Sequence, residues 1–253
     1  MFTNKLKGML SRGESAIGTF AAINSPDVIE LLAIAGYDFV IIDCEHGPMD
    51  AEASTNLIRA AEAYGMTPLA RVRCNSETVI LKHLDVGAHG VQIPQINTAD
   101  DARNAVRFSK YHPEGKRGVA LPRASGFGMF PIDEYFRQEN AETLVVVHCE
   151  NTTGLENLEE IAQVPGVDVI FLGPFDMSQS MGIPGQVGHP RIEAAAERVL
   201  EVCAQYGKVP GIFVGNAEAA RKRRDQGFRY LPISVDCTTI GGAFKAVVDA
   251  AKA

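Results

Sequence analysis

The chain alternates short apolar runs with amphipathic segments eight times along its 253 residues. Each apolar run is continuous rather than interrupted by polar residues, which is typical of parallel strands covered on both faces. The expected strands are residues 16–23, 38–43, 67–73, 90–96, 143–150, 167–173, 209–215 and 228–235. Eight strand-then-helix units in a chain of this length predict one α/β domain, a (β/α)8 TIM barrel spanning residues 1–253.

The segments between the strands carry the start and stop signals of helices. Before the second strand, Ser25 is an expected N-cap, Pro26 takes the first helical position and Gly36 ends the helix. A short amphipathic helix is also expected before the first strand, with Phe2, Leu6, Met9 and Leu10 on its apolar side. A doubly wound open sheet is the alternative that this pattern leaves open.

Two stretches break the regular spacing. Residues 113–138 form an oversized insertion after the fourth helix, and residues 174–190 form a long segment after the sixth strand. Loops of this length inside a compact domain usually serve a function.

Charge and apolar content limit the classes of function. A net charge of −7 argues against nucleic acid, whose binders carry concentrated basic surface. No apolar run approaches the ~20 residues needed to span a bilayer, so no membrane partner is expected. The five cysteines are widely spaced and include no CxxC pair, which favours reduced thiols and a cytoplasmic protein.

Barrel enzymes carry their active sites at the C-terminal ends of the strands. Polar residues follow most of the apolar runs of this chain, and together they predict a polar ring around one mouth. Its members are Asn24, Asp43, Glu45, His46, Arg71, Arg73, Gln92, Gln95, His148, Glu150, Asn151, Asp176, Asn216 and Asp236.

Glu150 and Asp176 are the candidate metal ligands. They follow adjacent strands, which lie about 5 Å apart, so their carboxylates can share one cation. Oxygen ligands suit Mg²⁺, Mn²⁺ or Co²⁺, with water in the remaining positions. The alternative is that both residues only cap local turns. Zinc also stays open because Cys44, Cys149 and Cys237 lie near strand ends, although these thiols are expected to face away from the mouth.

His46 is the candidate general base, because an imidazole titrates near neutral pH. Asp43 or Asp85 is the expected partner of its ring, and the alternative is a surface histidine in a turn. Arg71 ends an apolar strand, and a buried guanidinium needs a partner. That partner is either an anionic substrate or an internal carboxylate, Asp43 or Glu45.

The eight expected strands contain no lysine. A Schiff-base mechanism needs a lysine amine in the mouth, so the sequence predicts no Schiff-base lysine and favours a metal as the electron sink. No P-loop or GxGxxG motif follows an early strand.

Three blocks of the chain resemble one family. They are DFVIIDCEHGP (38–48), LDVGAHGVQIPQINTADDARNAVRFSKYHPEGKRGV (84–119) and GVDVIFLGPFDMSQSMGIPGQVGHP (166–190). They are similar to the HpcH/HpaI aldolases, the metal-dependent class II pyruvate aldolases such as 2,4-dihydroxyhept-2-ene-1,7-dioate aldolase, related to the citrate lyase β-subunit. The similarity runs from IGTF near the start to SVDCTTI near the end.

The resemblance implies reversible cleavage of 4-hydroxy-2-oxo acids to pyruvate and an aldehyde, through an enolate that a divalent metal stabilises. Glu150 and Asp176 would bind that metal. The resemblance also implies a homo-oligomer, expected to be a hexamer built as a trimer of dimers, in which the last helix of each barrel is exchanged between subunits.

The resemblance assigns roles to other residues of the mouth. His46 would be the base, with Asp43 and Asp85 supporting it, and Arg71 would hold the developing enolate.

A substrate loop is implied as well. The backbone N–H groups of Phe175 and Asp176 would hold the pyruvate carboxylate, with Gly173 and Pro174 in the same loop. Short loops of this kind form anion-binding nests.

Two positions depart from the family pattern. The family often has Gln where this chain has His148, and it commonly has Ala where this chain has Phe175. His148 is expected to face the mouth beside Glu150 and to contact substrate or metal, and Phe175 is expected to reshape the wall of the carboxylate pocket. Arg123 in the insertion is a candidate for binding the far end of a substrate, and the alternative is a surface or interface arginine.

Two other functions stay open at this point. One is a CoA-thioester lyase of the citrate lyase β-subunit type, for which HPEGKRG at residues 112–118 is the basic segment. The other is a non-catalytic metabolite-binding barrel. The charged residues gathered at the predicted mouth argue against the latter, because burying charges without a ligand is costly.

Overall fold

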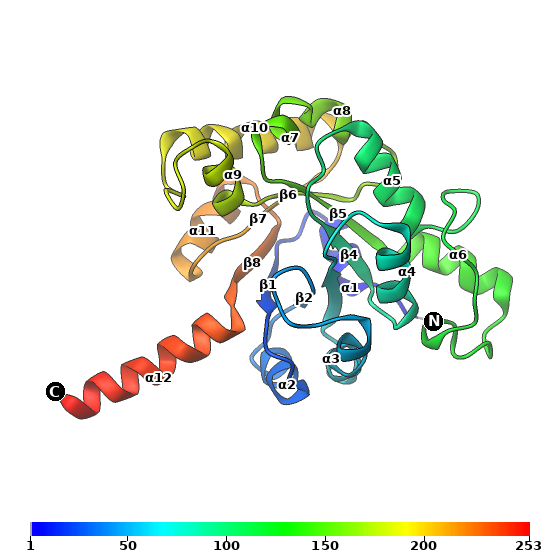
Figure 1. Cartoon of the computed structure of the whole chain (residues 1–253), viewed down its shortest axis with the longest axis horizontal. Coiled ribbons are helices and arrows are strands. Elements are labelled where there is room, and N and C mark those ends of the chain that lie inside the picture. The colour runs from blue at the N-terminus through cyan, green and yellow to red at the C-terminus, as the bar shows by residue number, and fades with distance from the viewer. Residues whose placement is uncertain (1) are drawn as a thin grey trace.

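The eight strands close into one parallel barrel (Figure 1). The structure is a computed structural model that describes residues 2–253. Each strand pairs with its neighbours in the chain, and the last pairs with the first. The strands are β1 (Ala16–Ala21), β2 (Phe39–Asp43), β3 (Thr67–Arg71), β4 (Gly90–Ile93), β5 (Leu144–Cys149), β6 (Val169–Leu172), β7 (Val209–Ile212) and β8 (Tyr230–Val235). The predicted barrel is confirmed, and the open sheet is excluded.

Helices surround the strands (Figure 1). They are α2 (Pro26–Ile34), α3 (Ala51–Ala63), α4 (Glu77–Asp85), α5 (Ala99–Ser109), α7 (Thr152–Glu156), α8 (Leu158–Ala162), α10 (Pro190–Tyr206) and α11 (Ala217–Gln226). The N-cap of α2 is confirmed, because the Ser25 hydroxyl accepts the backbone N–H of Val28. The helical segment after β5 is divided into α7 and α8 at Asn157, whose side chain donates to the carbonyl of Asn97 at 2.8 Å.

Alternate residues of each strand point into the barrel. On β2, Phe39 and Ile41 point inward and belong to the interior cluster, which is the group of buried apolar side chains inside the barrel. Val40 and Ile42 instead pack outward against α2 and α3. The next inward position is Asp43, at the C-terminal end of the strand. The same alternation on β5 places His148 inside, at the mouth of the barrel.

All five cysteines are free thiols. Cys44 and Cys149 are buried in the layer between strands and helices, as their alternation with acidic neighbours predicts. Cys237 is exposed instead, because β8 ends at Val235 and Cys237 lies in the first turn of α12 (Asp236–Lys252).

The N-terminal helix closes the other end of the barrel. This helix, α1 (Lys5–Ser11), buries Leu6 and Leu10 in the interior cluster, beside the first residues of the strands. The expected amphipathic helix is therefore confirmed, although it begins at Lys5 and does not include Phe2.

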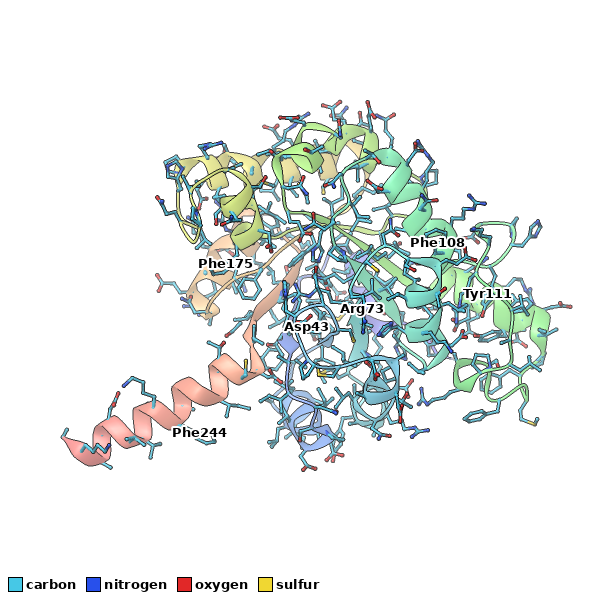
Figure 2. All side chains as sticks on the ribbon, in the orientation of Figure 1. Asp43, Arg73, Phe108, Tyr111, Phe175 and Phe244 are labelled. Atoms are coloured by element: carbon cyan, nitrogen blue, oxygen red, sulfur yellow. The ribbon has the colours of Figure 1, made fainter. Side chains whose placement is uncertain are left out.

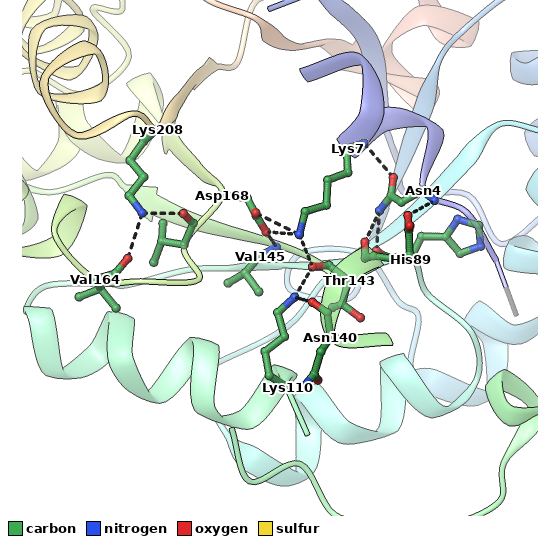
Figure 3. Close-up of polar contacts among 12 residues, drawn as sticks. Asn4, Lys7, His89, Lys110, Asn140, Thr143, Val145, Val164, Asp168 and Lys208 are labelled. Atoms are coloured by element: carbon green, nitrogen blue, oxygen red, sulfur yellow. Dashed lines mark hydrogen bonds and ion pairs between the residues drawn. The ribbon is translucent and has the colours of Figure 1, made fainter. Parts of the chain in front are cut away.

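Polar contacts hold α1 in place (Figure 3). Asn4 donates to the carbonyl of His89 at 2.9 Å, and the Lys7 ammonium lies 3.1 Å from the Asp168 carboxylate. Lys7 also shares the Thr143 carbonyl with Lys110, which is buried. Burial lowers the pKa of Lys110 to about 8.

The two long stretches contain helices that the sequence pattern does not reveal. The insertion holds the 3-10 turn η1 (Arg123–Ser125) and the start of α6 (Ile132–Glu142), which buries Tyr135 and Glu139 on one side. The segment after β6 begins directly with α9 (Pro174–Ser180), because Pro174 suits the first helical position.

The C-terminal helix α12 projects away from the barrel (Figures 1 and 2). Its apolar residues Phe244, Val247 and Val248 are exposed, with 69% of Phe244 accessible to solvent. None of the helices in residues 2–253 combines the length and apolar character that crossing a membrane requires.

One acidic residue joins the start of α12 to the first strand. The two carboxylate oxygens of Asp236 accept the backbone N–H groups of Ala22 and Ile23 at 2.9 and 3.1 Å. They reinforce the seam at which β8 pairs with β1.

Candidate active site

The C-terminal ends of the strands surround a cavity of about 480 Å³. Arg71 and His148 reach it from inward-facing strand positions, and Glu150 reaches it from the residue directly after β5. His46 and Asp176 reach it from the segments that follow β2 and β6. The predicted convergence of these side chains on one mouth is therefore observed within a single chain.

Asp43 and Arg71 form a two-point ion pair at this mouth. Arg71 Nε and Nη2 donate to Asp43 Oδ1 and Oδ2 at 2.9 and 2.6 Å, and Arg71 Nη1 lies 3.4 Å from Glu45 Oε2. The guanidinium also lies 4.6 Å from the centre of the Phe20 ring. Burial alone raises the pKa of Asp43, but the hydrogen bond and charge of Arg71 bring the net pKa below its usual value. Arg71 thus has the internal carboxylate partners, and its contact with a substrate anion stays a prediction.

His46 lies on the turn after β2, with its side chain exposed at the cavity. Asp43 Oδ1 accepts the backbone N–H groups of Glu45 and His46 at 3.1 Å each, so Asp43 fixes the turn rather than the ring. Within residues 2–253, no hydrogen bond to the His46 imidazole is formed. The ring is therefore free to turn toward a bound molecule.

Glu45 is a second titratable group beside His46. Burial raises the pKa of Glu45 above its usual value, although the nearby Arg71 charge opposes the shift. Its carboxyl group therefore takes up a proton at a higher pH than an exposed glutamate.

A buried chain of hydrogen bonds leads from Tyr230 to Glu150. The Tyr230 hydroxyl donates to Gln92 Oε1 at 2.7 Å, Gln92 Nε2 donates to His148 Nε2 at 2.8 Å, and His148 Nδ1 donates to Glu150 Oε2 at 2.5 Å. Burial raises the pKa of Tyr230 well above its usual value, so its hydroxyl stays a donor. Because the Glu150 carboxylate can only accept hydrogen bonds, His148 carries its proton on Nδ1.

The second oxygen of Glu150 has a backbone partner. The N–H of Gln95 donates to Glu150 Oε1 at 2.7 Å, from a residue whose φ of 56° lies in the left-handed region. Such a conformation costs about 1–3 kcal/mol for a residue other than glycine, and it persists where the surroundings require it. Burial alone raises the pKa of Glu150, but His148 and the Gln95 N–H bring the net pKa below its usual value.

Glu150 and Asp176 face a common space beside Gly173. A Cβ atom at Gly173 would lie 3.4 Å from Glu150 Oε2 and 3.9 Å from Asp176 Oδ2. Two carboxylate oxygens near one point fit a hard divalent cation that takes its other ligands from water or substrate. Within residues 2–253 no three His, Cys, Asp or Glu side chains gather into a metal cluster. The donor set therefore does not fit a zinc ion held by protein alone.

The first turn of α9 forms another wall of the cavity. Gly173, Pro174, Phe175 and Asp176 all line it. The first N–H groups of a helix have no acceptor within that helix, and here they belong to the residues expected to hold a carboxylate.

Four phenylalanines line one side of the cavity, and of these only Phe175 is predicted from the sequence. They are Phe20 of β1, Phe171 of β6, Phe175 of α9 and Phe213 after β7. Figure 2 shows Phe175 on the α9 side of the mouth and Asp43 toward the centre of the barrel. Phe20 and Phe171 occupy inward-facing positions of β1 and β6. Counting alternate residues along these strands is the sequence signal that identifies them.

Asp85 and Arg123 are not brought to the mouth of their own barrel. Asp85 ends α4, where the chain returns to the N-terminal end of the strands, and it pairs with buried Arg117 at 2.8 Å. Arg123 donates to the carbonyl of Val86 at 3.1 Å and pairs with Glu62.

Comparison with known proteins agrees with this geometry. Residues 16–241 match the family model of the HpcH/HpaI aldolase/citrate lyase proteins. The chain belongs to this family. It is 35% identical over 246 residues to the 4-hydroxy-2-oxo-heptane-1,7-dioate aldolase of Escherichia coli, a match that covers 96% of this chain and 93% of the relative.

Two further members of the HpcH/HpaI family support the same assignment. The hydroxypyruvate/pyruvate aldolase of Roseobacter denitrificans is 36% identical over 96% of this chain and 95% of the relative. The crystal structure of an HpcH/HpaI family protein from Burkholderia cenocepacia J2315 superposes with a TM-score of 0.94 at 36% identity, covering 99% of this chain and all of the other. The protein is an aldolase of class II, a carbon–carbon lyase.

Proposed function

We propose that this aldolase cleaves 4-hydroxy-2-oxo acids reversibly to pyruvate and an aldehyde, using a divalent cation held by Glu150 and Asp176. The observation that carries the proposal is the pair of carboxylates facing one point beside Gly173, in a cavity that also contains Arg71 and His46. Mg²⁺, Mn²⁺ and Co²⁺ are the proposed metals, because all three accept oxygen ligands.

The cation has one chemical task. When bound, it supplies the Lewis acid that stabilises negative charge on the keto oxygen of the substrate. Glu150 would hold it with oxygens whose orientation is already fixed, since His148 and the Gln95 N–H bind this carboxylate from two sides.

His46 moves the proton. In cleavage its imidazole accepts the proton of the 4-hydroxyl group, directly or through a water, while the C3–C4 bond breaks. The same proton then goes to the enolate carbon C3, which becomes the methyl group of pyruvate. In the reverse direction His46 takes a proton from that methyl group and delivers it to the oxygen of the new 4-hydroxyl group. The exposed, unpaired ring of His46 and the turn fixed by Asp43 support this role.

Arg71 holds the negative charge that develops on the pyruvate half. The Asp43 carboxylate accepts hydrogen bonds from its Nε and Nη2 atoms, so the guanidinium is oriented before substrate binds. The N–H groups of Phe175 and Asp176 hold the carboxylate, in the loop that Gly173 and Pro174 begin. The cavity lining supports this assignment.

We propose a cytoplasmic hexamer, a trimer of dimers that exchanges α12 between subunits. The exposed apolar residues Phe244, Val247 and Val248 support exchange, because an unpacked helix with such a face needs a partner surface. In this assembly Asp85 would act at a neighbouring mouth in support of His46, whereas Arg123, held by Glu62 and the Val86 carbonyl, would be an interface arginine.

The competing CoA-thioester lyase loses its sequence support. In the basic segment of residues 112–118, Arg117 is buried between Asp85 and Glu139, and Lys116 pairs with Glu77 at 2.8 Å. These cations have internal partners and do not form an exposed patch for phosphates.

The deciding experiment is exchange of the pyruvate methyl protons in D₂O, followed by NMR. Protein stripped with EDTA is compared with protein supplied with Mg²⁺, Mn²⁺ or Co²⁺. Exchange that depends on the metal demonstrates enolate formation without any assumption about the aldehyde. Absence of exchange with all three metals would overturn the proposal, and acyl-CoA binding would then be tested.

A further inference from the structure

The four phenylalanines of the cavity form one continuous aromatic wall, Phe175–Phe213–Phe20–Phe171. Ring centres are 5.9 Å apart between Phe175 and Phe213, 5.8 Å between Phe213 and Phe20, and 6.3 Å between Phe20 and Phe171. All three pairs are tilted or edge-on, the arrangements that aromatic rings prefer.

The wall runs from the buried floor of the cavity to its rim. Phe171 and Phe20 are almost fully buried, whereas 53% of Phe175 is exposed. An exposed phenylalanine at the rim of a binding cavity offers apolar area that a ligand can cover.

The cavity offers little to a second carboxylate. Among its lining residues Arg71 is the one arginine and there is no lysine. Asp43 and Glu45 lie against its three guanidinium nitrogens, and under the proposed function its remaining N–H groups are taken by the pyruvate half. Besides the residues with proposed roles in metal binding and proton transfer (His46, His148, Glu150 and Asp176), the polar side chains of the lining are the neutral Ser234 and Thr238.

We propose that the aromatic wall binds the tail of the aldehyde, and that this aldolase selects aldehydes with an aromatic or other apolar tail over aldehydes with a terminal carboxylate. This inference rests on the proposed function. Phe175 is the main determinant, because it adds apolar area at the rim where the family resemblance leads one to expect alanine.

The reaction itself is the ordinary aldol addition. The methyl carbon of pyruvate loses one proton and bonds to the aldehyde carbonyl carbon, and the aldehyde oxygen gains one proton as the 4-hydroxyl group. The wall takes no part in this bond formation and contributes through binding alone, so its effect belongs chiefly in KM for the aldehyde.

The test uses two aldehydes that differ only in their tail. Succinic semialdehyde and 3-phenylpropanal share the chain CHO–CH₂–CH₂ and end in a carboxylate and a phenyl ring. The value of kcat/KM for each is measured with the metal-loaded full chain and a fixed excess of pyruvate. We expect a preference of roughly tenfold or more for 3-phenylpropanal, the size of one well-placed aromatic contact.

Substitutions of Phe175 test whether the aromatic wall causes the preference for 3-phenylpropanal. In Phe175→Ala the ratio of the two kcat/KM values is expected to fall roughly tenfold, through a higher KM for 3-phenylpropanal. Phe175→Leu should restore part of it. Tyr64→Ala is the matched control, because Tyr64 is an equally exposed aromatic residue, 52% accessible, at the end of α3. Its ratio should equal that of the unaltered protein.

Pyruvate methyl exchange, measured on the same samples, separates the two proposals. Normal exchange together with a preference for succinic semialdehyde would overturn this inference and leave the proposed function intact. Normal exchange with a ratio that Phe175→Ala does not change would also overturn it. Loss of exchange in the unaltered protein would instead overturn the proposed function, and this inference with it.

Discussion

Glu150 is held before any ligand binds. Both of its oxygens receive hydrogen bonds, from His148 on one side and from the Gln95 N–H on the other. His148 is itself fixed by Gln92 and, through it, by Tyr230. Partners of this kind orient a metal ligand and raise its affinity for the cation.

His148→Ala should therefore weaken Mn²⁺ binding. The expected loss is roughly 10- to 100-fold, because Glu150 keeps its charge but loses its fixed orientation. Free Mn²⁺ measured by EPR in a titration gives the dissociation constant without reference to activity. His148→Gln is the matched variant, since its amide donates to Glu150 and accepts from Gln92, and it should bind within a few-fold of the unaltered protein. Equal affinity in His148→Ala would show that the chain of hydrogen bonds does not orient Glu150.

His46→Ala and Glu150→Ala should lose activity for different reasons. Removing the His46 imidazole should lower turnover by roughly 10²- to 10⁴-fold and leave Mn²⁺ affinity unchanged, because His46 is proposed to move a proton and not to bind the metal. Glu150→Ala should abolish metal retention. Turnover and Mn²⁺ content are measured on both variants, and a near-normal rate in His46→Ala would remove it from the mechanism.

Asp43→Asn should cost stability at neutral pH and little at acid pH. The pKa of Asp43 lies below its ordinary value of 3.8, so its stabilising effect is complete above that value and is lost as the pH falls through the lower one. At pH 7 the expected loss is about 3 kcal/mol, because Arg71 loses its main partner in a buried site. Urea unfolding at a series of pH values should show the two curves converging in acid. A constant gap would contradict this account.

At the scale of the element, α1 acts as the floor of the barrel. Leu6 is fully buried below the interior cluster, at the end opposite to the mouth. Leu6→Ala should reduce the free energy of unfolding by about 2–5 kcal/mol, because a core cavity is left behind. The KM for pyruvate should not change. Lys5→Ala, on the exposed side of the same helix, is the control, and a comparable loss there would contradict the role of the apolar side.

Sequence patterns predict elements well where a single rule decides. Ser25 and Pro26 mark the start of α2, and continuous apolar runs mark all eight strands. The patterns fail at α6 and α9, which lie in long polar or glycine-rich stretches. Tyr135 of α6 packs against Tyr111, which precedes the insertion, and no local signal encodes this contact.

At the scale of the whole molecule, the candidate site is predictable as far as strand alternation reaches. The inward positions of Asp43, Arg71 and Glu150 follow from counting along each strand. The contact of Phe175 with Phe213 does not, because it joins two segments that lie beyond the regular strands. Strand alternation also gives no information about Asp85, because this residue ends a helix and lies at the N-terminal end of the strands.

The exposed face of α12 provides a test at this scale. Replacing Phe244 and Val247 by Asp should reduce the assembly below a hexamer, because charges on the buried face of an exchanged helix would be desolvated. Light scattering after size-exclusion chromatography measures the mass directly. Lys245→Glu, which alters charge on the same helix but outside its apolar face, is the control. A hexameric mass in the double variant would contradict exchange through this face.

The seam between β8 and β1 has a consequence for synthesis. A ribosome makes β1 early and β8 near the end, so the growing chain carries an unpaired β1 edge for most of its translation. Asp236 follows β8 directly and binds the backbone at the end of β1. A nascent chain that stops short of β8 therefore has neither a closed barrel nor a complete cavity, and lyase activity can begin only after β8 has left the ribosome.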